Sequence, residues 1–368
     1  MKAVGGDWAQ QRNKFGYRLD LLSTLGVGHS TRRLLANARH RRALRDRQER
    51  VPDDMWREAA AELGADVREL APMLLEFRFG QVVTRVRGQT TPFADPISEA
   101  VASDKPLAYR VLAQAGLRVP RHELVGIGQT GAAKDFLART GGPCIVKPAR
   151  GRGGSGVTGE VRTEAQMRRA LVSAGRFDGH AIIEQQSPGD SYRLLILDGD
   201  ILDIIQRPRP RVVGDGKSTI EELMFRQYAR RIKDEGPSGL KPFTVDLDCL
   251  FTLEQSGHTI RDVLEAGASV TIKTVTNYNG PEECLTVPPP YPEGMVALAQ
   301  RAASALEVRL GGVDLVADDE ANAVVLEVNA IPGLTHHYNV ADPAQAPHIA
   351  VPILASLLHV HGTTAAAP

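Results

Sequence analysis

The spacing of apolar and polar residues predicts a mixture of helices and strands along most of the chain. Short apolar runs bounded by Gly, Pro or polar residues indicate strands, whereas apolar residues recurring every three or four positions indicate helices. The predicted helices span residues 103–116, 130–140, 218–233 and 292–306. The predicted strands span residues 144–147, 181–184, 192–197, 201–206 and 270–275. Because strands cluster, we expect an α+β fold with mostly antiparallel pairing rather than a doubly wound parallel sheet.

Polar residues at the starts of two predicted helices would cap them. Ser103 precedes the helix that ends at Gly116. The run Ser218–Glu221 places a carboxylate three positions after a hydroxyl residue, which is the capping-box pattern. Such side chains accept hydrogen bonds from the first backbone N–H groups of a helix, so both helices are expected to begin at these residues.

The first 95 residues form a separate domain in our interpretation, because Pro92 and Pro96 interrupt the chain there. Residues 29–50 are rich in arginine, and the leucines among them indicate a helix that continues beyond Pro52 over residues 53–63. A solvated helix face or a subunit contact is the favoured role, since no aromatic residues interleave with the charges. Binding of an acidic substrate or of phosphate is a third option. We therefore expect a smaller, helix-rich domain that serves substrate binding or oligomerisation.

Composition restricts the classes of protein to consider. With 368 residues the chain can form two or three domains, and its 44 basic and 44 acidic residues give no nucleic-acid or membrane signature. The cysteines Cys144, Cys249 and Cys284 are scattered, which suggests a reducing compartment and no zinc site. The N-terminus lacks the apolar segment of a signal peptide. A cytoplasmic protein without nucleic-acid or membrane partners is therefore expected.

Two apolar stretches late in the chain carry polar residues that suggest chemistry. Residues 311–316 and 324–329 are predicted strands, joined by a polar hairpin tip. Side chains alternate along a strand, so Glu327 and Asn329 share one face, and antiparallel pairing brings Asp314 to the same face. These side chains offer hard oxygen ligands, which Mg²⁺ accepts when phosphates fill its remaining positions. The alternative is an ordinary hairpin whose polar face is in solvent.

A lysine on an apolar strand stands just before a glycine-rich segment. Lys147 lies at the end of the predicted strand, and residues 150–156 include four glycines. A buried lysine needs an anionic partner, because its charge is otherwise desolvated. Glycines let the loop fold over a nucleotide and direct backbone N–H groups at phosphates. The loop alone is equally consistent with a hairpin tip, but the lysine before it favours a phosphate clamp.

Two other glycine motifs do not fit the functions that they imitate. Residues 126–131 match the GxGxxG pattern, but the next strand ends in Lys147, where a dinucleotide fold needs an acidic residue for the ribose. Residues 214–218 imitate the end of a Walker A loop, although Arg211 stands where its first glycine should be. We interpret the second motif as a turn that leads into the capped helix.

A polar hinge is the fourth element of the candidate site. The run Glu184–Gly189, Glu-Gln-Gln-Ser-Pro-Gly, can offer backbone groups to an adenine edge, although this signal is weak by itself. The strand lysine, the glycine-rich loop, the hinge and the Asp…Glu-x-Asn hairpin, in this order, resemble the ATP-grasp ligases over residues 103–340. The combination is far more specific than any one of the motifs.

The sequence is similar in particular to the ATP-grasp module of cyanophycin synthetase. That similarity is carried by Asp104–Lys105, Tyr192–Arg193 and Val212–Thr219. The later segment Glu327–His337 is also similar to D-alanine–D-alanine ligase. A second ligase half, which cyanophycin synthetase has, does not follow this module, so synthesis of a two-residue polymer is not expected.

The resemblance implies the ATP-grasp fold, in which two α+β subdomains clamp ATP. We place the first subdomain at residues 96–188, with the glycine-rich loop, and the second at residues 189–360, with the metal hairpin. The tail, residues 361–368, is expected to be disordered. The substrate pocket of this family comes largely from the preceding domain, and residues 74–87 are the part of it that we expect to reach the site.

The resemblance also implies roles for individual residues. ATP phosphates would contact Lys105, Lys147, Gly153, Gly154, Ser155 and Gly156. Adenine would lie on Glu184, Gln185, Gln186 and Ser187. The transferred phosphate would face Arg193 and Lys273. Two Mg²⁺ ions, with Mn²⁺ as an alternative, would bind Asp314, Glu327 and Asn329. Gly333 would act in catalysis at the loop that binds the carboxylate end of the acceptor, together with His337 and Tyr338.

One position departs from the family pattern. The hinge residue that usually carries an acidic ribose contact is Ser191, and Asp190 stands one residue early. Either the loop is shifted by one residue, with Asp190 at the ribose, or the ribose is held more weakly. His336 and His337 could assist amine deprotonation, but a role in shaping their loop is favoured.

The implied reaction joins a carboxylate to an amine. A substrate carboxylate would attack the γ-phosphate of ATP, and an amine would displace phosphate from the acyl phosphate to form an amide. Amino acids or short peptides are the expected substrates, and a homo-oligomer, dimer or tetramer, is the expected assembly. Two alternatives stay open: a kinase-like enzyme that stops after phosphorylation, and a nucleotide-binding subunit without turnover.

Overall fold

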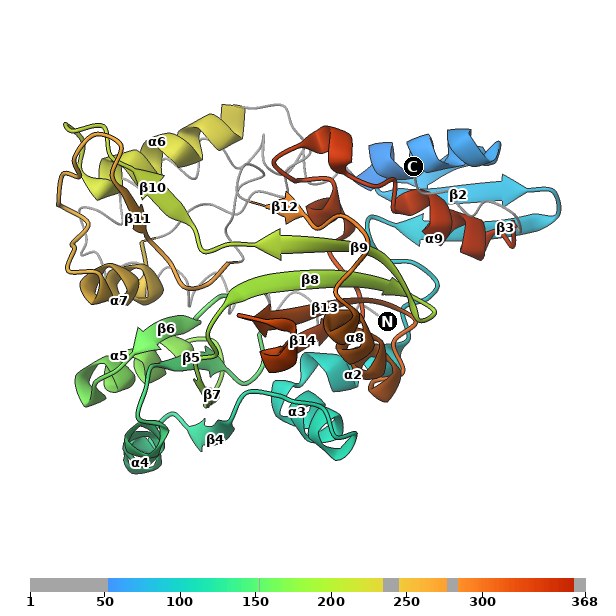
Figure 1. Cartoon of the computed structure of the whole chain (residues 1–368). Helices are drawn as coiled ribbons and strands as arrows, with labels where there is room; N and C mark the ends of the chain where they lie inside the picture. Colours follow the sequence, from blue (N-terminus) through green and yellow to red (C-terminus); the bar gives the residue numbers. More distant parts are fainter. Residues whose placement is uncertain (1–51, 152, 234–244, 277–283, 361–368) are drawn as a thin grey trace.

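A computed structural model describes residues 52–151, 153–233, 245–276 and 284–360. Within these residues the strands form sheets of two, three, four and five strands, and every pairing between strands is antiparallel. Helices cover the sheets, so the fold is α+β, as the pattern of strands and helices predicts (Figure 1).

The five-stranded sheet is the centre of the molecule (Figure 1). Its strands, in spatial order, are β12 (Leu285–Thr286), β9 (Asp200–Arg207), β8 (Asp190–Leu197), β13 (Leu310–Ala317) and β14 (Val324–Asn329). Three helices pack on one face: α2 (Pro96–Ser103), α3 (Lys105–Gln114) and α8 (Glu293–Ala305). Alternation sends Leu194 and Val313 to this apolar face, and the neighbouring residues Arg193 and Asp314 to the other face.

The four-stranded sheet belongs to the first predicted subdomain. Its order is β4 (His122–Gly126), β7 (His180–Gln185), β5 (Cys144–Pro148) and β6 (Thr158–Val161). Three helices complete its core: α4 (Thr130–Thr140), α5 (Glu164–Ala174) and α7 (Leu247–Gln255). Leu247 and Phe251 of α7 come from far along the chain, yet they are buried in this core. The boundary that we predict at residue 188 therefore does not separate all contacts of the two subdomains.

A smaller unit lies beside this sheet. Strands β10 (Arg211–Val213) and β11 (Ser269–Thr271) pair with each other, and α6 (Ile220–Lys233) packs near them. Short 3-10 helices η2 (Glu320–Asn322), η3 (Leu334–His337) and η4 (Pro343–Gln345) connect the later elements.

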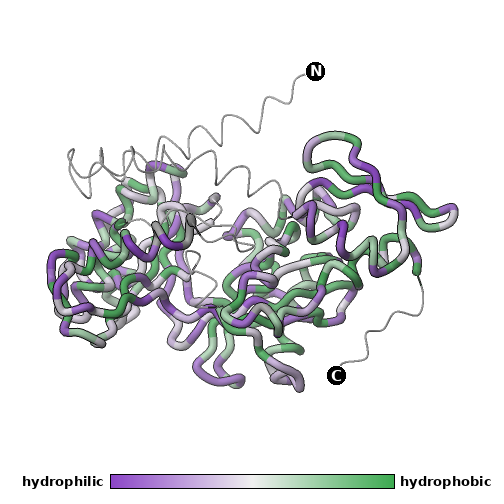
Figure 2. Tube along the Cα trace, turned by 90° about the horizontal axis from the view of Figure 1, so that it is seen from above, coloured by the Kyte–Doolittle hydropathy of each residue, from purple (hydrophilic) through white to green (hydrophobic). Residues whose placement is uncertain are grey.

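The three-stranded sheet comes from the N-terminal part of the chain. Strands β1 (Asp66–Ala71), β2 (Leu74–Phe79) and β3 (Val82–Arg87) form a meander, which packs with α9 (Ala350–Leu357) and a helix over residues 52–63. Their apolar core includes Leu195, Leu197 and Leu310 of the central sheet. Seen from above, this meander extends at the right-hand end of the molecule, with hydrophobic and hydrophilic residues alternating along it (Figure 2).

The start of the chain was predicted to be rich in helix. The described part, from residue 52 onward, contains one helix and the β1–β3 meander before α2. The arginine-rich segment, residues 29–50, lies outside the described residues, as does the tail at 361–368. The proposed domain division therefore stays a prediction.

Helix starts differ from the predicted caps by one residue. Asp104, not Ser103, caps α3 by accepting a hydrogen bond from the backbone N–H of Leu107. The capping box of α6 pairs Thr219 with Glu222, one position later than predicted. Ser218 instead donates to Asp215 in the preceding turn, which confirms that residues 214–218 form a turn and not a phosphate loop. In both cases a nearby Asp side chain accounts for the difference: Asp104 accepts from the first turn of α3, and Asp215 accepts from Ser218.

Candidate active site

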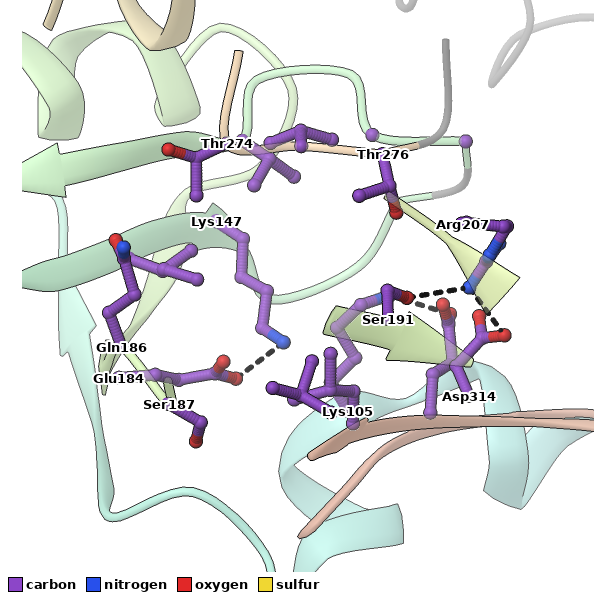
Figure 3. A pocket seen from close by; sticks show the side chains of 18 of the residues that line it. Lys105, Lys147, Glu184, Gln186, Ser187, Ser191, Arg207, Thr274, Thr276 and Asp314 are labelled. Atoms are coloured by element: carbon purple, nitrogen blue, oxygen red, sulfur yellow. Dashed lines mark hydrogen bonds and ion pairs between the residues drawn. The ribbon is translucent and has the colours of Figure 1, made fainter. Parts of the chain in front are cut away.

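A cavity, partly open to solvent, lies between the four-stranded sheet and the central sheet. It is lined by residues of the four sequence elements that we expected to act together, and Figure 3 shows Lys147, Glu184 and Asp314 around it. Its wall includes the following predicted residues: Lys105, Lys147, Gly153, Gly154, Ser155, Glu184, Gln186, Ser187, Ser191, Asp314 and Glu327. This convergence of polar groups in one concave site is typical of a nucleotide or small-ligand pocket.

Lys147 has the anionic partner that its position on an apolar strand requires. Its Nζ lies 2.5 Å from Oε1 of Glu184 on the adjacent strand β7 and 2.9 Å from the hydroxyl of Tyr109. The Tyr109 hydroxyl is also 2.8 Å from Glu184, and its burial raises the pKa of this phenol well above the ordinary value. The lysine is thus fixed in direction and placed on the cavity wall.

The glycine-rich loop has backbone angles that a side chain would strain. Gly153, Gly154 and Gly156 have φ values of 68°, 76° and 74°. A Cβ on Gly156 would also lie 2.5 Å from the ring of Phe177. Lys105 donates a hydrogen bond to the carbonyl of Gly151 at 2.9 Å, so this lysine holds the start of the loop.

The hinge is joined to the strand that follows the glycine-rich loop. Gln186 donates to Oε1 of Glu160 at 2.6 Å and accepts from the backbone N–H of Glu160 at 3.0 Å. Arg209 lies 3.5 Å from the same carboxylate. Glu160 is buried in the left-handed region at φ 52°, a strained conformation that structures keep where neighbours fix it. Gln185 is exposed and does not line the cavity.

The hinge position that departs from the family pattern faces the cavity. Ser191 lines it and accepts a hydrogen bond from Arg207 at 3.1 Å. Asp190 does not line it, and its carboxylate accepts from Gln206 at 2.7 Å. No shift of the loop brings Asp190 to the cavity here, and the contact with ribose stays a prediction.

Asp314 is the most strongly held carboxylate of the site. Arg193 donates to both of its oxygens, at 2.8 and 2.7 Å, and Arg207 donates to Oδ1 at 2.8 Å. Burial alone would raise the pKa of Asp314, but the two guanidinium groups outweigh this effect and lower it to about 2. The carboxylate is therefore ionised throughout the physiological range.

The three predicted metal ligands lie on one face of the β13–β14 hairpin. Asp314 pairs directly with Glu327, and the Asn329 amide nitrogen lies 3.5 Å from Oδ2 of Asp314. Lys105 is 3.3 Å from Glu327. Two carboxylates and an amide carbonyl form a hard donor set that suits Mg²⁺.

The described residues contain no group of three or more His, Cys, Asp or Glu side chains that could hold a metal. A metal at the hairpin would therefore depend on the carbonyl oxygen of Asn329 and on ligands from outside the protein. Phosphates are the ligands that the surrounding lysines and arginines favour.

Lys273 does not line the cavity. It is fully buried, and its Nζ lies 2.7 Å from Oδ1 of Asp246 and 2.5 Å from Oδ2. The next residues, Thr274 to Thr276, do form part of the wall. Its predicted contact with the transferred phosphate stays a prediction.

The loop after β14 turns three of its groups away from the cavity. The backbone N–H of Thr335 donates to Gln89 at 2.9 Å. His337 is fully buried, with Nδ1 2.5 Å from Asp203. The Tyr338 hydroxyl accepts a hydrogen bond from the backbone N–H of Ala350, the first residue of α9, at 3.0 Å. Burial is the main reason that the pKa of this hydroxyl is raised to about 12. These contacts are structural.

Gly333 of the same loop lies close to His336 and to Arg193. A Cβ on Gly333 would lie 3.0 Å from Nε2 of His336 and 3.8 Å from Nη1 of Arg193. His336 also contributes to lowering the pKa of Asp314, after the arginines. Of the two histidines considered for the site, the structure therefore brings His336 close to it and holds His337 in the core.

Sequence reasoning missed several residues of the cavity. The main ones are Arg207, Arg209, Thr274, Val275 and Thr276. Arg207 lies on the same strand face as Asp203, four positions earlier, because side chains alternate along a strand. Two charged residues on one face of an apolar strand were the sequence feature that could have indicated Arg207. Thr274 and Val275 were assigned to the strand predicted over residues 270–275, but β11 ends at Thr271 and the chain then leaves the sheet.

Comparison with solved structures shows the fold. A bifunctional glutathione synthetase from Pasteurella multocida superimposes with a TM-score of 0.53 and 20% sequence identity, covering 82% of this chain and 43% of that one. The chain shares the ATP-grasp fold, with its antiparallel sheets, with that enzyme.

The sequence is similar to that of two kinds of ligase. Cyanophycin synthetase from Trichormus variabilis is 26% identical over 306 residues, covering 77% of this chain, and the glutathione biosynthesis bifunctional protein from Streptococcus thermophilus is 27% identical over 259 residues, covering 66%. The chain spans 34% of the length of each of these relatives. No protein-family model matches the chain.

Among the helices in the described ranges, none is both long enough and apolar enough to cross a bilayer.

Proposed function

We propose that the protein is an ATP-dependent carboxylate–amine ligase that joins amino acids or short peptides through an acyl phosphate. One observation carries the proposal. An ionised, buried Asp314 lies between two arginines at the wall of the cavity, and the Glu327–Lys105 pair lies beside it. A carboxylate and cations in this arrangement suit a metal-bound triphosphate better than any uncharged ligand.

ATP would be held along the cavity from the hinge to the hairpin. Adenine would lie on the hinge at residues 184–187, of which Glu184, Gln186 and Ser187 line the cavity. Lys147 and the backbone N–H groups of the glycine-rich loop would contact the phosphates, as Lys105 would from the other side. Mg²⁺ on Asp314, Glu327 and Asn329 would neutralise phosphate charge; two ions, or Mn²⁺, are the finer form of this proposal.

The chemistry would depend on position and charge rather than on a covalent enzyme intermediate. A substrate carboxylate oxygen attacks the γ-phosphorus, ADP leaves, and an acyl phosphate forms. An amine then attacks the acyl carbon, and phosphate leaves with the former carboxylate oxygen. Arg193 and Arg207 lie where negative charge develops, and closure of the glycine-rich loop would exclude water from the acyl phosphate.

A second cavity would hold the acid substrate. It shares Gly151, Gly153 and Glu327 with the first cavity and extends to Asn329 and α2. A carboxylate bound there would approach the phosphates from the side of the metal ligands. Amino acids and short peptides are the substrates that the names of the relatives suggest.

A trapping experiment tests the proposal against its two alternatives. The protein is incubated with ATP, Mg²⁺, a panel of amino acids and dipeptides, and hydroxylamine. A ligase gives ADP and a hydroxamate, because hydroxylamine captures the acyl phosphate. A stable phosphorylated substrate would indicate the kinase-like enzyme. ATP binding without either product would indicate the nucleotide-binding subunit.

Three further points belong to the same proposal. A homo-oligomer, dimer or tetramer, would suit an enzyme of this kind, and a cytoplasmic location would suit its use of ATP. The N-terminal meander and residues 1–51 would supply contacts to the substrate or to a second subunit. Size-exclusion chromatography with light scattering decides the oligomeric state.

A further inference from the structure

A buried acid–lysine cluster lies behind one wall of the nucleotide cavity. Asp248 near the start of α7 and Lys273 after β11 are both fully buried. The Nζ of Lys273 lies 2.5 Å from Oδ2 of Asp246 and 3.7 Å from Oδ2 of Asp248. Burial raises the pKa of Asp248, and Lys273 opposes this effect. A buried carboxylate of this kind persists only where several donors stabilise it.

The donors to Asp248 come from two different segments of the chain. Its Oδ1 accepts from the backbone N–H of Gly159 at 2.9 Å, and Gly159 lies on β6, just after the glycine-rich loop. Its Oδ2 accepts from the backbone N–H groups of Thr274 at 3.1 Å and Val275 at 3.0 Å. Residues 274–276 line the cavity, on the opposite side from Lys105 (Figure 3). One carboxylate thus connects the strand of the first subdomain to the wall contributed by the second.

The two connected segments are in close contact. A Cβ on Gly159 would lie 2.7 Å from Cγ2 of Thr274 and 3.0 Å from Oδ1 of Asp248. The Thr274 hydroxyl lies 3.0 Å from the hydroxyl of Thr252, also on α7. Helix α7 is itself anchored, because Phe251 is buried in the core of the four-stranded sheet. The wall at residues 274–276 therefore has one position relative to β6.

We propose that Asp248 is a positioning residue for the nucleotide: its carboxylate fixes the wall at residues 274–276 against the strand that follows the glycine-rich loop. The proposal rests on the proposed function only in that the ligand of the cavity is ATP. Asp248 itself does not line the cavity, so it acts through the two backbone segments that it joins. Its loss should weaken nucleotide binding and leave the binding of the acid and amine substrates unchanged.

The test substitutes Asp248→Asn, which keeps the shape but offers one acceptor oxygen and one donor group. One of the two segments then loses its hydrogen bond and meets a donor instead. ATP affinity, measured by calorimetry with Mg²⁺ and without turnover, should fall about tenfold, the size expected for a hydrogen bond to a charged group. The KM of the amino-acid substrate should change less than twofold. The calorimetric result for ATP needs no turnover, so it stands whether or not the protein is a ligase.

Asp246→Asn is the matched control. It removes a charge from the same cluster, but the carboxylate of Asp246 accepts from Lys273 and caps α7 by accepting from the N–H of Cys249, whereas that of Asp248 accepts from Thr274 and Val275 of the wall. Its ATP affinity should stay within twofold of the wild type. Equal losses of affinity in both variants would overturn the proposal, as would wild-type affinity in a folded Asp248→Asn protein.

A second variant covers the case in which Asp248→Asn does not fold. Gly159→Ala leaves every charge in place and adds a methyl group against Thr274. The wall must then move away from β6, so ATP affinity should again fall while the KM of the amino-acid substrate stays unchanged. Wild-type ATP affinity in this variant would contradict a role for this spacing.

Discussion

At the scale of single residues, the site is organised by buried ions that neutralise one another. Asp314 joins Arg193 and Arg207, and Glu184 joins Lys147. Pairs of this kind contribute little net stability when intact, but the loss of one partner leaves the other charge buried and unpaired. The same pairs hold cations on the cavity wall for an anionic ligand.

Asp314→Asn should destabilise the protein by about 3–5 kcal/mol, because two buried arginines lose their carboxylate. Urea denaturation measures the change. Asp198→Asn is the control, since the Asp198–Arg309 pair is largely exposed and should contribute about 1 kcal/mol or less. Equal effects of the two substitutions would contradict the view that Asp314 is structurally held.

The same carboxylate predicts a dependence of stability on pH. The pKa of Asp314 is about 2 in the folded protein, below its ordinary value of 3.8. A lowered pKa contributes stability that is present above the unfolded value and is lost as pH falls through the folded one. Between pH 4 and pH 2 the wild type should therefore lose roughly 2 kcal/mol more than Asp314→Asn, as measured by urea denaturation. Parallel pH profiles of the two proteins would disprove this assignment.

At the scale of elements, loops are held by contacts that come from distant parts of the chain. The glycine-rich loop packs on Phe177, and the loop after β14 is held by Gln89, Asp203 and α9. Loops positioned in this way can present groups to a ligand without a new element of secondary structure.

Gly156→Ala should lower the free energy of unfolding, measured by urea denaturation, because the added Cβ is strained by the backbone angle and meets the ring of Phe177. The left-handed angle costs about 1 kcal/mol, and crowding against the ring adds about 1–3 kcal/mol. Gly141→Ala is the control, because Gly141 has φ 64° but nothing within 4 Å of its added Cβ. A double-mutant cycle with Phe177→Ala should recover the crowding part. No coupling between the two positions would show that the ring does not limit the loop.

Gln89→Ala should weaken binding of the substrate at the loop after β14 and leave the KM of ATP unchanged. The side chain of Gln89 accepts the backbone N–H of Thr335, so its loss frees the loop near Gly333 and Arg193. A lost hydrogen bond of about 1 kcal/mol predicts a rise of roughly fivefold in the substrate KM. Gln89→Glu keeps an acceptor oxygen, so its substrate KM should stay close to that of the wild type. An altered KM for ATP would instead place the effect in the nucleotide cavity.

At the scale of the whole molecule, the sequence predicted the parts of the site that follow from alternation along strands. Asp314, Glu327 and Asn329 share a face because a strand repeats every two residues, and Lys147 lines the cavity because it lies at the end of β5 before the glycine loop. The α+β class with antiparallel sheets and the ATP-grasp fold are confirmed.

The rest of the site could not be predicted because it depends on contacts distant in the sequence. Asp246, 27 positions away, holds Lys273 in the core, and the expected contact of this lysine with the phosphate stays a prediction. The hydroxyl of Tyr338 accepts a hydrogen bond from the start of α9. Arg207 donates a hydrogen bond to Asp314, which is 107 positions away in the sequence. Local patterns give the direction of a side chain on its own strand, not the partner that another element brings to it.

The central claim, that the chain transfers phosphate from ATP to a carboxylate before an amine displaces it, can be tested by following one oxygen atom. The acid substrate is labelled with ¹⁸O in its carboxylate, and the phosphate released during coupling is analysed by mass spectrometry. An acyl phosphate intermediate predicts one ¹⁸O atom in each phosphate released and none in the nucleotide. Unlabelled phosphate, or ¹⁸O in AMP, would contradict the account.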